Sequence, residues 1–292
     1  MKDRDPKLWI RKNFSRASKS YDEAAALQRA IADLLLERLR YLQTPPWRIL
    51  EGGAGTGYVT RKIYDYCPKA FVVASDISLA MLESAKGNDR RWFKKTHYCA
   101  GDMEALPFKN QSFDAFICNL ALQWCNPQKV FSEVYRVLKP NGLLLCSTFG
   151  PDTLLELRQA FDNTRVHTFV DMHDLGSLLM QAGFVDPVLD SEWHIRYYPE
   201  IEDLYRELKG LGAMSVLPGK SGLGGRSLLQ KAKTNYEVLR TPEGLPSTYE
   251  VIFIQAWVGP SKNRDTESTI SLDQLQRLGN QKAMQSRKMK SI

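Results

Sequence analysis

A glycine-rich loop follows the first apolar run of the chain and is preceded by an acid. The residues concerned are Glu51, Gly53, Gly55 and Gly57. Because glycine has no Cβ, such a loop turns sharply and lets its backbone approach a ligand closely. A second acid, Asp76, ends the next apolar run, nineteen residues after Gly57. This spacing predicts a nucleoside-containing ligand whose ribose hydroxyls are bound by Asp76.

Two classes of ligand use such a loop, and charge separates them. A dinucleotide site needs the pattern G-x-G-x-x-G, but Tyr58 stands where the third glycine belongs. A carboxylate at Glu51 would also repel a pyrophosphate. S-adenosylmethionine has no phosphate and carries a sulfonium and an ammonium, both of which an acid attracts. The loop therefore favours S-adenosylmethionine as the cofactor.

Two further segments, each at the end of an apolar run, extend the predicted site. After the third run, Asp102 can accept a hydrogen bond from the adenine amino group, and Met103 can contact the ring. After the fourth run, Asn119 is expected beside the methionine part of the cofactor. Trp124 is either a wall of the acceptor pocket or a core aromatic, and the sequence leaves both interpretations open.

Apolar runs bounded by turn residues predict strands that alternate with helices. The expected strands of the first half are Trp47–Leu50, Phe71–Ser75, Thr96–Ala100, Phe113–Asn119 and Gly142–Thr148. The helices expected around them are 24–42, 58–66, 78–86 and 127–138. Alternating strands and helices predict an α/β fold with a parallel sheet covered on both faces.

The second half of the chain has a different pattern. Asp152 is expected to cap a helix that ends near Phe161, and Asp174–Ala182 is expected to be helical. The remaining expected elements are strands at 184–198 and Thr248–Trp257, with helices at 201–211 and 225–239 between them. These two helices are predicted to form an insertion over the cofactor end of the sheet.

The charge of the chain is concentrated at its two ends. Its net charge is +7, and residues 1–20 carry seven Lys and Arg against two acids, while residues 261–292 carry seven against three. A basic arm attracts an acidic partner. The expected parts are a basic arm and amphipathic helix (1–45), a cofactor-binding core (46–150), a substrate-side half (151–258, with the insertion at about 200–245) and a basic, disordered tail (259–292).

Composition argues against several other classes of protein. No apolar run approaches the about 18 residues of a membrane span, and the first residues lack the apolar stretch of a signal peptide. The five cysteines are scattered and have no metal-ligand spacing. We therefore expect a cytoplasmic protein without a metal site and without a membrane partner.

The ordered motifs resemble the class I S-adenosylmethionine-dependent methyltransferases. They are Glu51-x-Gly53-x-Gly55-x-Gly57, Asp76-Ile77-Ser78-x-x-Met81-Leu82, Gly101-Asp102-Met103-Glu104-x-Leu106-Pro107 and Phe113-Asp114. The first motif of that superfamily usually has Asp where this chain has Glu51, which keeps the charge. The resemblance implies a doubly wound, mostly parallel, seven-stranded Rossmann-like sheet with a helical insertion before the last strand.

Further motifs resemble one family of that superfamily, the malonyl-acyl-carrier-protein O-methyltransferases of biotin synthesis. They are Phe14-x-Arg16-Ala17-x-x-x-Tyr21, Asn119-Leu120-Ala121-Leu122-Gln123-Trp124, Phe149-Gly150-Pro151-Asp152-Thr153-Leu154-x-Glu156-Leu157, Asp171-Met172-His173-Asp174-Leu175-Gly176, Leu208-Lys209-Gly210-Leu211-Gly212-Ala213 and Pro246-Ser247-Thr248-Tyr249-Glu250. The resemblance runs from about residue 10 to residue 258.

This resemblance implies an activity and the residues that perform it. The family transfers a methyl group from S-adenosylmethionine to the free carboxylate of a malonyl thioester on acyl carrier protein, and the ester starts pimeloyl synthesis. The cofactor would be bound by Glu51, Gly53, Gly55, Gly57, Asp76, Ile77, Met81, Asp102, Met103, Asn119 and Leu120. The acceptor would be held by Tyr21, Trp124, Arg165, His167 and Lys209. The acidic carrier protein would dock on the basic N-terminal arm.

Three other functions compete with this interpretation. The segment 149–157 and the stretch Leu175–Phe184 also resemble a methyltransferase-like family that assists assembly of respiratory complex I and hydroxylates a protein arginine. The basic ends invite a nucleic-acid substrate, but the chain lacks interleaved aromatic and basic residues, so we expect no nucleic-acid partner. A non-catalytic binding protein is disfavoured because all segments of the cofactor site are present.

Overall fold

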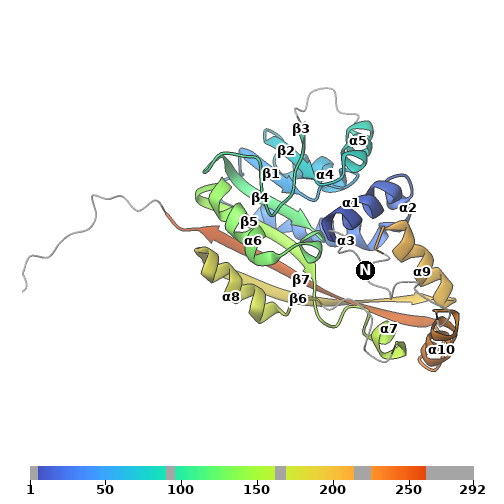
Figure 1. Ribbon diagram of the computed structural model, residues 1–292. Coiled ribbons are helices and arrows are strands. Elements are labelled where there is room, and N and C mark those ends of the chain that lie inside the picture. Colours follow the sequence, from blue (N-terminus) through green and yellow to red (C-terminus); the bar gives the residue numbers. More distant parts are fainter. Residues whose placement is uncertain (1–5, 90–95, 162–168, 214–224, 261–292) are drawn as a thin grey trace, which may run out of the picture. The chain divides into compact units, whose positions relative to one another are not determined.

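A seven-stranded, mostly parallel sheet organises the chain, as predicted (Figure 1). The computed structural model describes residues 6–89, 96–161, 169–213 and 225–260. The strands are β1 (Arg48–Gly52), β2 (Phe71–Asp76), β3 (Thr96–Ala100), β4 (Phe113–Asn119), β5 (Leu138–Phe149), β6 (Phe184–Tyr198) and β7 (Leu245–Val258), in the order β3-β2-β1-β4-β5-β7-β6. The first five run parallel, and β7 lies antiparallel between β5 and β6. The carboxyl ends of β1, β2, β4 and β5 therefore meet at one edge.

Helices cover both faces of this sheet (Figure 1). They are α1 (Pro6–Ala17), α2 (Tyr21–Ala24), α3 (Ala26–Glu37), α4 (Tyr58–Tyr66), α5 (Leu79–Asn88), α6 (Pro127–Val137), α7 (Leu155–Ala160), α8 (Met172–Ala182), α9 (Ile201–Gly210) and α10 (Gly225–Glu237). Ile49 and Leu50, adjacent in β1, point to opposite faces because side chains alternate along a strand. Ile49 joins the core that contains Ile31 of α3, and Leu50 joins the core that contains Val134 of α6.

Local sequence signals fix several helix ends. The side chain of Ser78 accepts a hydrogen bond from the backbone of Met81 at the start of α5. Asn126 caps α6 in the same way, and Pro127 occupies the first position of that helix. Gly183 ends α8 in the left-handed region, with φ +101°. All three helices begin or end within a few residues of their predicted bounds.

The structure departs from the predicted elements in three places. The strand expected at Gly142–Thr148 is longer in the structure, because β5 begins at Leu138, with a register shift opposite β4 and φ +61° at Asn141. The helix expected over 24–42 ends at Glu37, and a short 3-10 helix, η1 (Arg38–Tyr41), follows it. A second short 3-10 helix, η2 (Leu122–Trp124), follows β4. Tertiary packing rather than propensity sets these ends.

Asp152 does not cap a helix, contrary to the expectation from the sequence. Its backbone N–H donates to Oε2 of the buried Glu250 at 2.8 Å. The chain then turns through Leu154, which has φ +57°, and α7 begins only at Leu155. The carboxylate of Asp152, which would have capped the helix, instead accepts a hydrogen bond from Nε1 of Trp193 at 3.3 Å.

The helices α9 and α10 lie between β6 and β7, as predicted, but they pack in different places. Helix α9 contacts α2, whereas α10 packs against α7. The part of the N-terminal arm that the structure describes is not an extended arm, because it forms α1 and packs on α5. Within the described ranges, no helix has the length and apolar character needed to cross a bilayer. The predicted tail lies outside the described residues from 261 onward.

Candidate functional site

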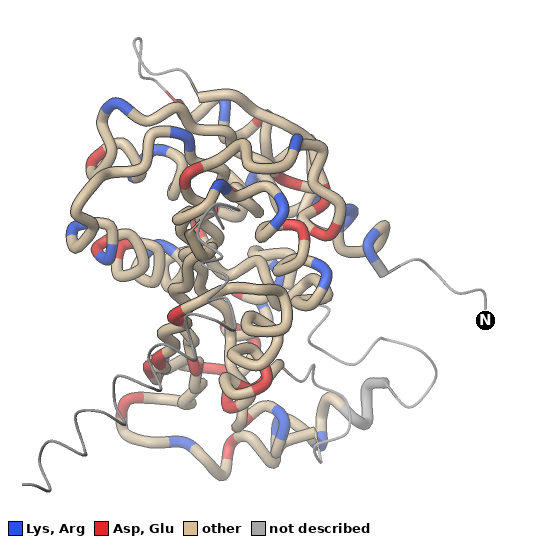
Figure 2. Tube along the Cα trace, turned by 90° about the vertical axis from the view of Figure 1, so that its left-hand side faces the viewer, with Lys and Arg blue, Asp and Glu red and all other residues tan. Residues whose placement is uncertain are grey.

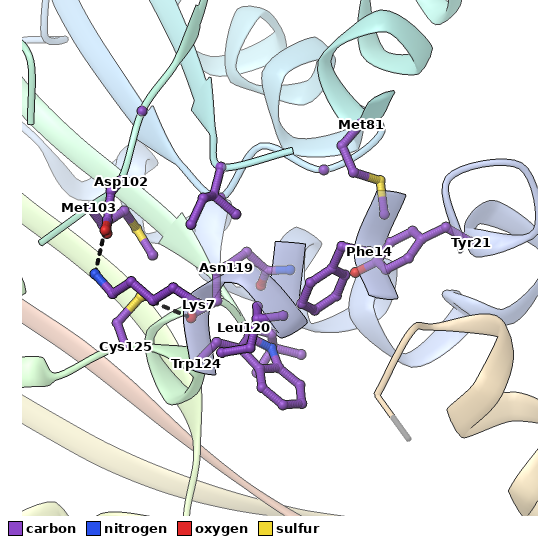
Figure 3. Close-up of a pocket in the computed structure, with 16 residues that line it drawn as sticks. Lys7, Phe14, Tyr21, Met81, Asp102, Met103, Asn119, Leu120, Trp124 and Cys125 are labelled. Carbon is purple, nitrogen blue, oxygen red and sulfur yellow. Dashed lines mark hydrogen bonds and ion pairs between the residues drawn. The ribbon is translucent and has the colours of Figure 1, made fainter. Parts of the chain in front are cut away.

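The carboxyl ends of the parallel strands border a cavity with about 680 Å³ of empty space, here called the main cavity (Figure 3). Eight of the residues predicted from the cofactor motifs line it: Gly53, Gly55, Ile77, Met81, Asp102, Met103, Asn119 and Leu120. Helix α1 contributes Lys7, Ile10 and Phe14 from the other side. The structure thus brings together loops from four strands under one N-terminal helix.

The glycine loop has the conformation that its residue types require. Gly53, Gly55 and Gly57 have φ of +68°, +53° and +80°, a region that other residues rarely adopt. A Cβ on Gly53 would lie 2.4 Å from the Cβ of Ala121, whereas one on Gly55 would meet no atom within 4 Å. Gly55 therefore faces open space in the main cavity, which suits the close approach of a ligand.

Asp76, the last residue of β2, holds this loop in place through hydrogen bonds to its carboxylate. Its Oδ2 accepts a hydrogen bond from the N–H of Gly55 at 2.9 Å, and its Oδ1 accepts one from Ser78 at 2.8 Å. Asp76 is 9% exposed and does not itself line the main cavity, although its neighbours Gly55 and Ile77 do. Each carboxylate oxygen keeps a lone pair for another donor, and Asp76 can therefore also accept a hydrogen bond from a ribose hydroxyl. That contact stays a prediction.

Glu51 lies deeper than the sequence suggested. It is 2% exposed, and its carboxylate accepts a hydrogen bond from the hydroxyl of Thr60. Burial raises the pKa of Glu51 to about 8 against the lowering effect of Thr60, and the charge of Asp76 raises it further. Glu51 borders a smaller space of about 410 Å³ between the glycine loop and α3, here called the loop cavity, which Arg29 also lines.

An unpredicted ion pair closes the main cavity at Asp102 (Figure 3). Lys7 of α1 binds Oδ2 of Asp102, and its Nζ lies 2.9 Å from Oε2 of Glu104. Oδ1 of Asp102 accepts the N–H of Glu104 at 2.9 Å. Lys7 is visible in the sequence only as one charge of a basic segment, so its contact with this carboxylate required the fold.

Asn119 is held by both ends of its side-chain amide. Its Nδ2 donates to the main-chain oxygen of Gln28 at 3.1 Å, and its Oδ1 accepts from the hydroxyl of Ser147 at 2.8 Å. Leu120 follows with φ +48°, and its N–H donates to the hydroxyl of Ser147. This network ties α3, β4 and β5 together where the main cavity ends.

A second space of about 520 Å³, here called the apolar cavity, adjoins the main cavity. The two share Phe14, Tyr21, Leu120 and Trp124 in their walls. The other side chains of the apolar cavity are Gln28, Gln123, Phe149, Thr153, Leu154, Phe169, Leu208, Leu211, Ala213 and Tyr249. The rings of Phe14 and Trp124 meet edge to face, with centroids 5.5 Å apart. Trp124 therefore lines both cavities and also packs against the core that contains Ile49.

Tyr21 lies where all three cavities meet, since it lines each of them. Burial raises the pKa of Tyr21, and the charges of Asp76 and Asp22 raise it further. Its hydroxyl therefore stays protonated and can donate a hydrogen bond at neutral pH.

The other residues predicted to hold the acceptor are Lys209, Arg165 and His167. Lys209 lies on the exposed side of α9 and lines none of the three cavities, whereas the adjacent Leu208 points into the apolar cavity. The contact of Lys209 with the acceptor therefore stays a prediction, which this placement does not support. Arg165 and His167 lie outside the described residues. In the described part of the chain, no group of three or more His, Cys, Asp or Glu residues has the arrangement of a metal site.

Comparisons with solved structures agree with this architecture. The YcgJ protein of Bacillus subtilis superposes with a TM-score of 0.57 at 18% identity, over 79% of this chain and 98% of that protein. A phosphoethanolamine N-methyltransferase 2 from Haemonchus contortus, solved with S-adenosylhomocysteine, also gives a TM-score of 0.57, at 20% identity over 89% of this chain and 61% of that protein. At this identity the likeness shows a shared fold.

Sequence comparisons are more specific. Residues 50–146 match the family described as "Methyltransferase domain". The malonyl-[acyl-carrier protein] O-methyltransferase of Gallionella capsiferriformans is 41% identical over 273 residues, which are 89% of this chain and 94% of that protein. Relatives so named from Nitrosospira multiformis and Coxiella burnetii are 42% and 39% identical, over 85% and 91% of this chain and 88% and 94% of those proteins. The chain therefore belongs to the malonyl-[acyl-carrier protein] O-methyltransferase family.

Proposed function

We propose that the protein transfers a methyl group from S-adenosylmethionine to the free carboxylate of a malonyl group carried by acyl carrier protein. The observation that carries this proposal is the meeting of three cavities at Tyr21, because a cofactor and an acceptor can reach one point from opposite sides. The names of the relatives favour this reaction over the alternative arginine hydroxylation. The methyl ester would start the pimeloyl chain of biotin, as the resemblance implies.

The cavities fit the parts of the cofactor. Asp102 and Met103 in the main cavity suit an adenine amino group and ring, and Ile77 and Met81 supply apolar walls. The amino-acid end of S-adenosylmethionine carries both charges, and the loop cavity offers both Glu51 and Arg29. Sequence reasoning missed Arg29, because nothing in its spacing separates it from a surface cation. When bound, the cofactor supplies a methyl group on a positively charged sulfur.

The chain's own residues then have to position the acceptor rather than ionise it. A malonyl carboxylate is ionised at neutral pH, so no general base is needed, and the reacting atoms must be held about 3 to 3.5 Å apart. The apolar cavity excludes water through Phe14, Trp124 and Phe169. The hydroxyl of Tyr21 is placed to donate to the carboxylate, with Arg165 and His167 as further candidates.

The carrier protein is expected to dock on α1. Its basic residues Arg11, Lys12 and Arg16 are exposed, while Phe14 of the same helix lines both cavities. Figure 2 shows basic positions along this first helix, next to the N-terminus. A helix that is basic outside and apolar inside can bind an acidic carrier and admit its acyl chain below.

One assay tests the reaction. The purified protein is incubated with methyl-labelled S-adenosylmethionine and malonyl-acyl carrier protein, with acetyl-acyl carrier protein as the matched control. We expect base-labile label on the malonyl carrier alone, because only a methyl ester hydrolyses in mild base and only the malonyl group offers a free carboxylate. Label on RNA, or none on the malonyl carrier, would refute the substrate.

A further inference from the structure

Gln28 stands out among the polar side chains around the cavities. Besides Tyr21, it is the residue that lines both the apolar cavity and the loop cavity among those the structure describes. Its position is fixed from behind, because its main-chain oxygen accepts a hydrogen bond from Nδ2 of Asn119 at 3.1 Å. The side chain therefore lies at the boundary between the proposed amino-acid end of the cofactor and the proposed acceptor.

The side-chain oxygen of Gln28 has no partner. Oε1 is buried and makes no hydrogen bond to any atom of the described residues. A buried carbonyl left unpaired destabilises the fold, because it has given up hydrogen bonds to water and gained none in return. Gln123, the other glutamine of the apolar cavity, is satisfied within the protein, since its Nε2 donates to the oxygen of Leu120 at 2.7 Å and its Oε1 accepts from Thr148 at 3.3 Å. The difference indicates that Gln28 is kept for a ligand.

We propose that the side-chain amide of Gln28 binds both substrates and selects acceptors that carry a carboxylate. Its oxygen accepts a hydrogen bond from the cofactor's ammonium in the loop cavity, and its NH₂ group donates to the acceptor carboxylate in the apolar cavity. An amide is suited to this because it has both an acceptor and a donor, whereas a carboxylate accepts only and would repel the acceptor. The inference rests on the proposed function and adds a residue that determines substrate specificity.

Three variants test it by measuring binding. Gln28→Glu keeps the side-chain oxygen and removes the donor, while Gln28→Met removes both. Gln128→Glu, on the exposed side of α6, is the matched charge control. Calorimetry measures the affinity for S-adenosylhomocysteine, and then the affinity of the S-adenosylhomocysteine-loaded protein for malonyl-acyl carrier protein and acetyl-acyl carrier protein.

The expected pattern separates the two ligands. Gln28→Glu should keep its affinity for S-adenosylhomocysteine within about 3-fold and lose at least about 10-fold in affinity for the malonyl carrier, with little change for the acetyl carrier. Gln28→Met should weaken binding of both S-adenosylhomocysteine and the malonyl carrier by about 5-fold to 10-fold. Gln128→Glu should behave as the unsubstituted protein does.

Two outcomes would overturn the inference. One is a Gln28→Glu variant that still prefers the malonyl over the acetyl carrier as strongly as the unsubstituted protein. The other is an equal loss for all ligands together with a lower Tm, which would mean a purely structural role. If the unsubstituted protein itself neither prefers nor methylates the malonyl carrier, the proposed function fails as well, so the two failures are distinguishable.

Discussion

The main cavity and the apolar cavity are adjacent, yet the chain builds them in different ways. The main cavity is formed largely by loops that directly follow strands, and hydrogen bonds from backbone N–H groups hold its shape, as where Gly55 donates to the carboxylate of Asp76. The apolar cavity is formed by side chains from distant segments, including Phe14, Leu208 and Tyr249. A cofactor site can therefore be retained on this fold while the acceptor site changes by substitutions elsewhere.

The largest expected effect on the main cavity comes from Asp76→Ala. The change removes the predicted ribose contact and also frees the N–H of Gly55, so both the ligand and the loop lose a partner. We expect affinity for S-adenosylhomocysteine to fall about 100-fold by calorimetry, and the free energy of unfolding to fall by about 1 to 3 kcal/mol because buried N–H groups lose their acceptor. Asp65→Ala, at an exposed acid on α4, is the control. Unchanged affinity would remove Asp76 from the ribose site.

The apolar cavity is tested by a substitution that fills it. Ala213 lines the apolar cavity but not the main cavity, so Ala213→Trp should block the acceptor and spare the cofactor. The added side chain should cost the bound acceptor about 2 kcal/mol of transition-state stabilisation, and we therefore expect kcat/KM for the malonyl carrier to fall about 30-fold. Affinity for S-adenosylhomocysteine should be unchanged, and Ala213→Ser should be close to normal in both measurements. A parallel loss of cofactor affinity would mean that the two cavities are not independent.

A smaller effect is expected from Glu51, which titrates at the wall of the loop cavity. Because burial raises its pKa to about 8, Glu51 is mostly protonated at pH 7 and gains its charge as the pH rises. A cationic ligand binds the charged form better, so cofactor affinity should rise about 10-fold between about pH 7 and 9. Glu51→Gln should lose this dependence, and the difference between the two proteins removes the titration of the ligand itself.

The same pKa has the opposite effect on stability. A group whose pKa is higher in the folded state stabilises the fold while it is protonated, and this contribution is lost as the pH rises from the ordinary value of 4.5 toward about 8. The Tm of the ligand-free protein should therefore decline more steeply over that range than the Tm of Glu51→Gln. Identical pH profiles for the two proteins would contradict the raised pKa.

The sequence predicts some residues of the site and not others, for a physical reason. Gly53 and Asp102 were predicted because turn geometry and strand ends are local features of the chain. The roles of Lys7 and Gln28 were missed, since each depends on how a helix packs over strands far away in sequence. The exposed position of Lys209 could have been predicted from a local signal.

That signal is the periodicity of α9. Ile201, Leu204 and Leu208 are buried at helical spacing, and the next residue after a buried position lies about 100° further round the helix. Lys209 therefore points away from the cavity that Leu208 lines.

The smallest predicted effect concerns α1, a helix that contributes to both cavities and also faces solvent. Arg11→Glu and Lys12→Glu should each raise KM for the malonyl carrier about 3-fold at low salt, because rim charges act mainly on encounter with an acidic partner. The effect should vanish near about 0.5 M salt, where screening shortens the range of charge interactions. Lys109→Glu, an exposed cation outside α1, should leave KM unchanged. An equal rise for Lys109→Glu would mean that net charge, rather than docking on α1, governs the encounter.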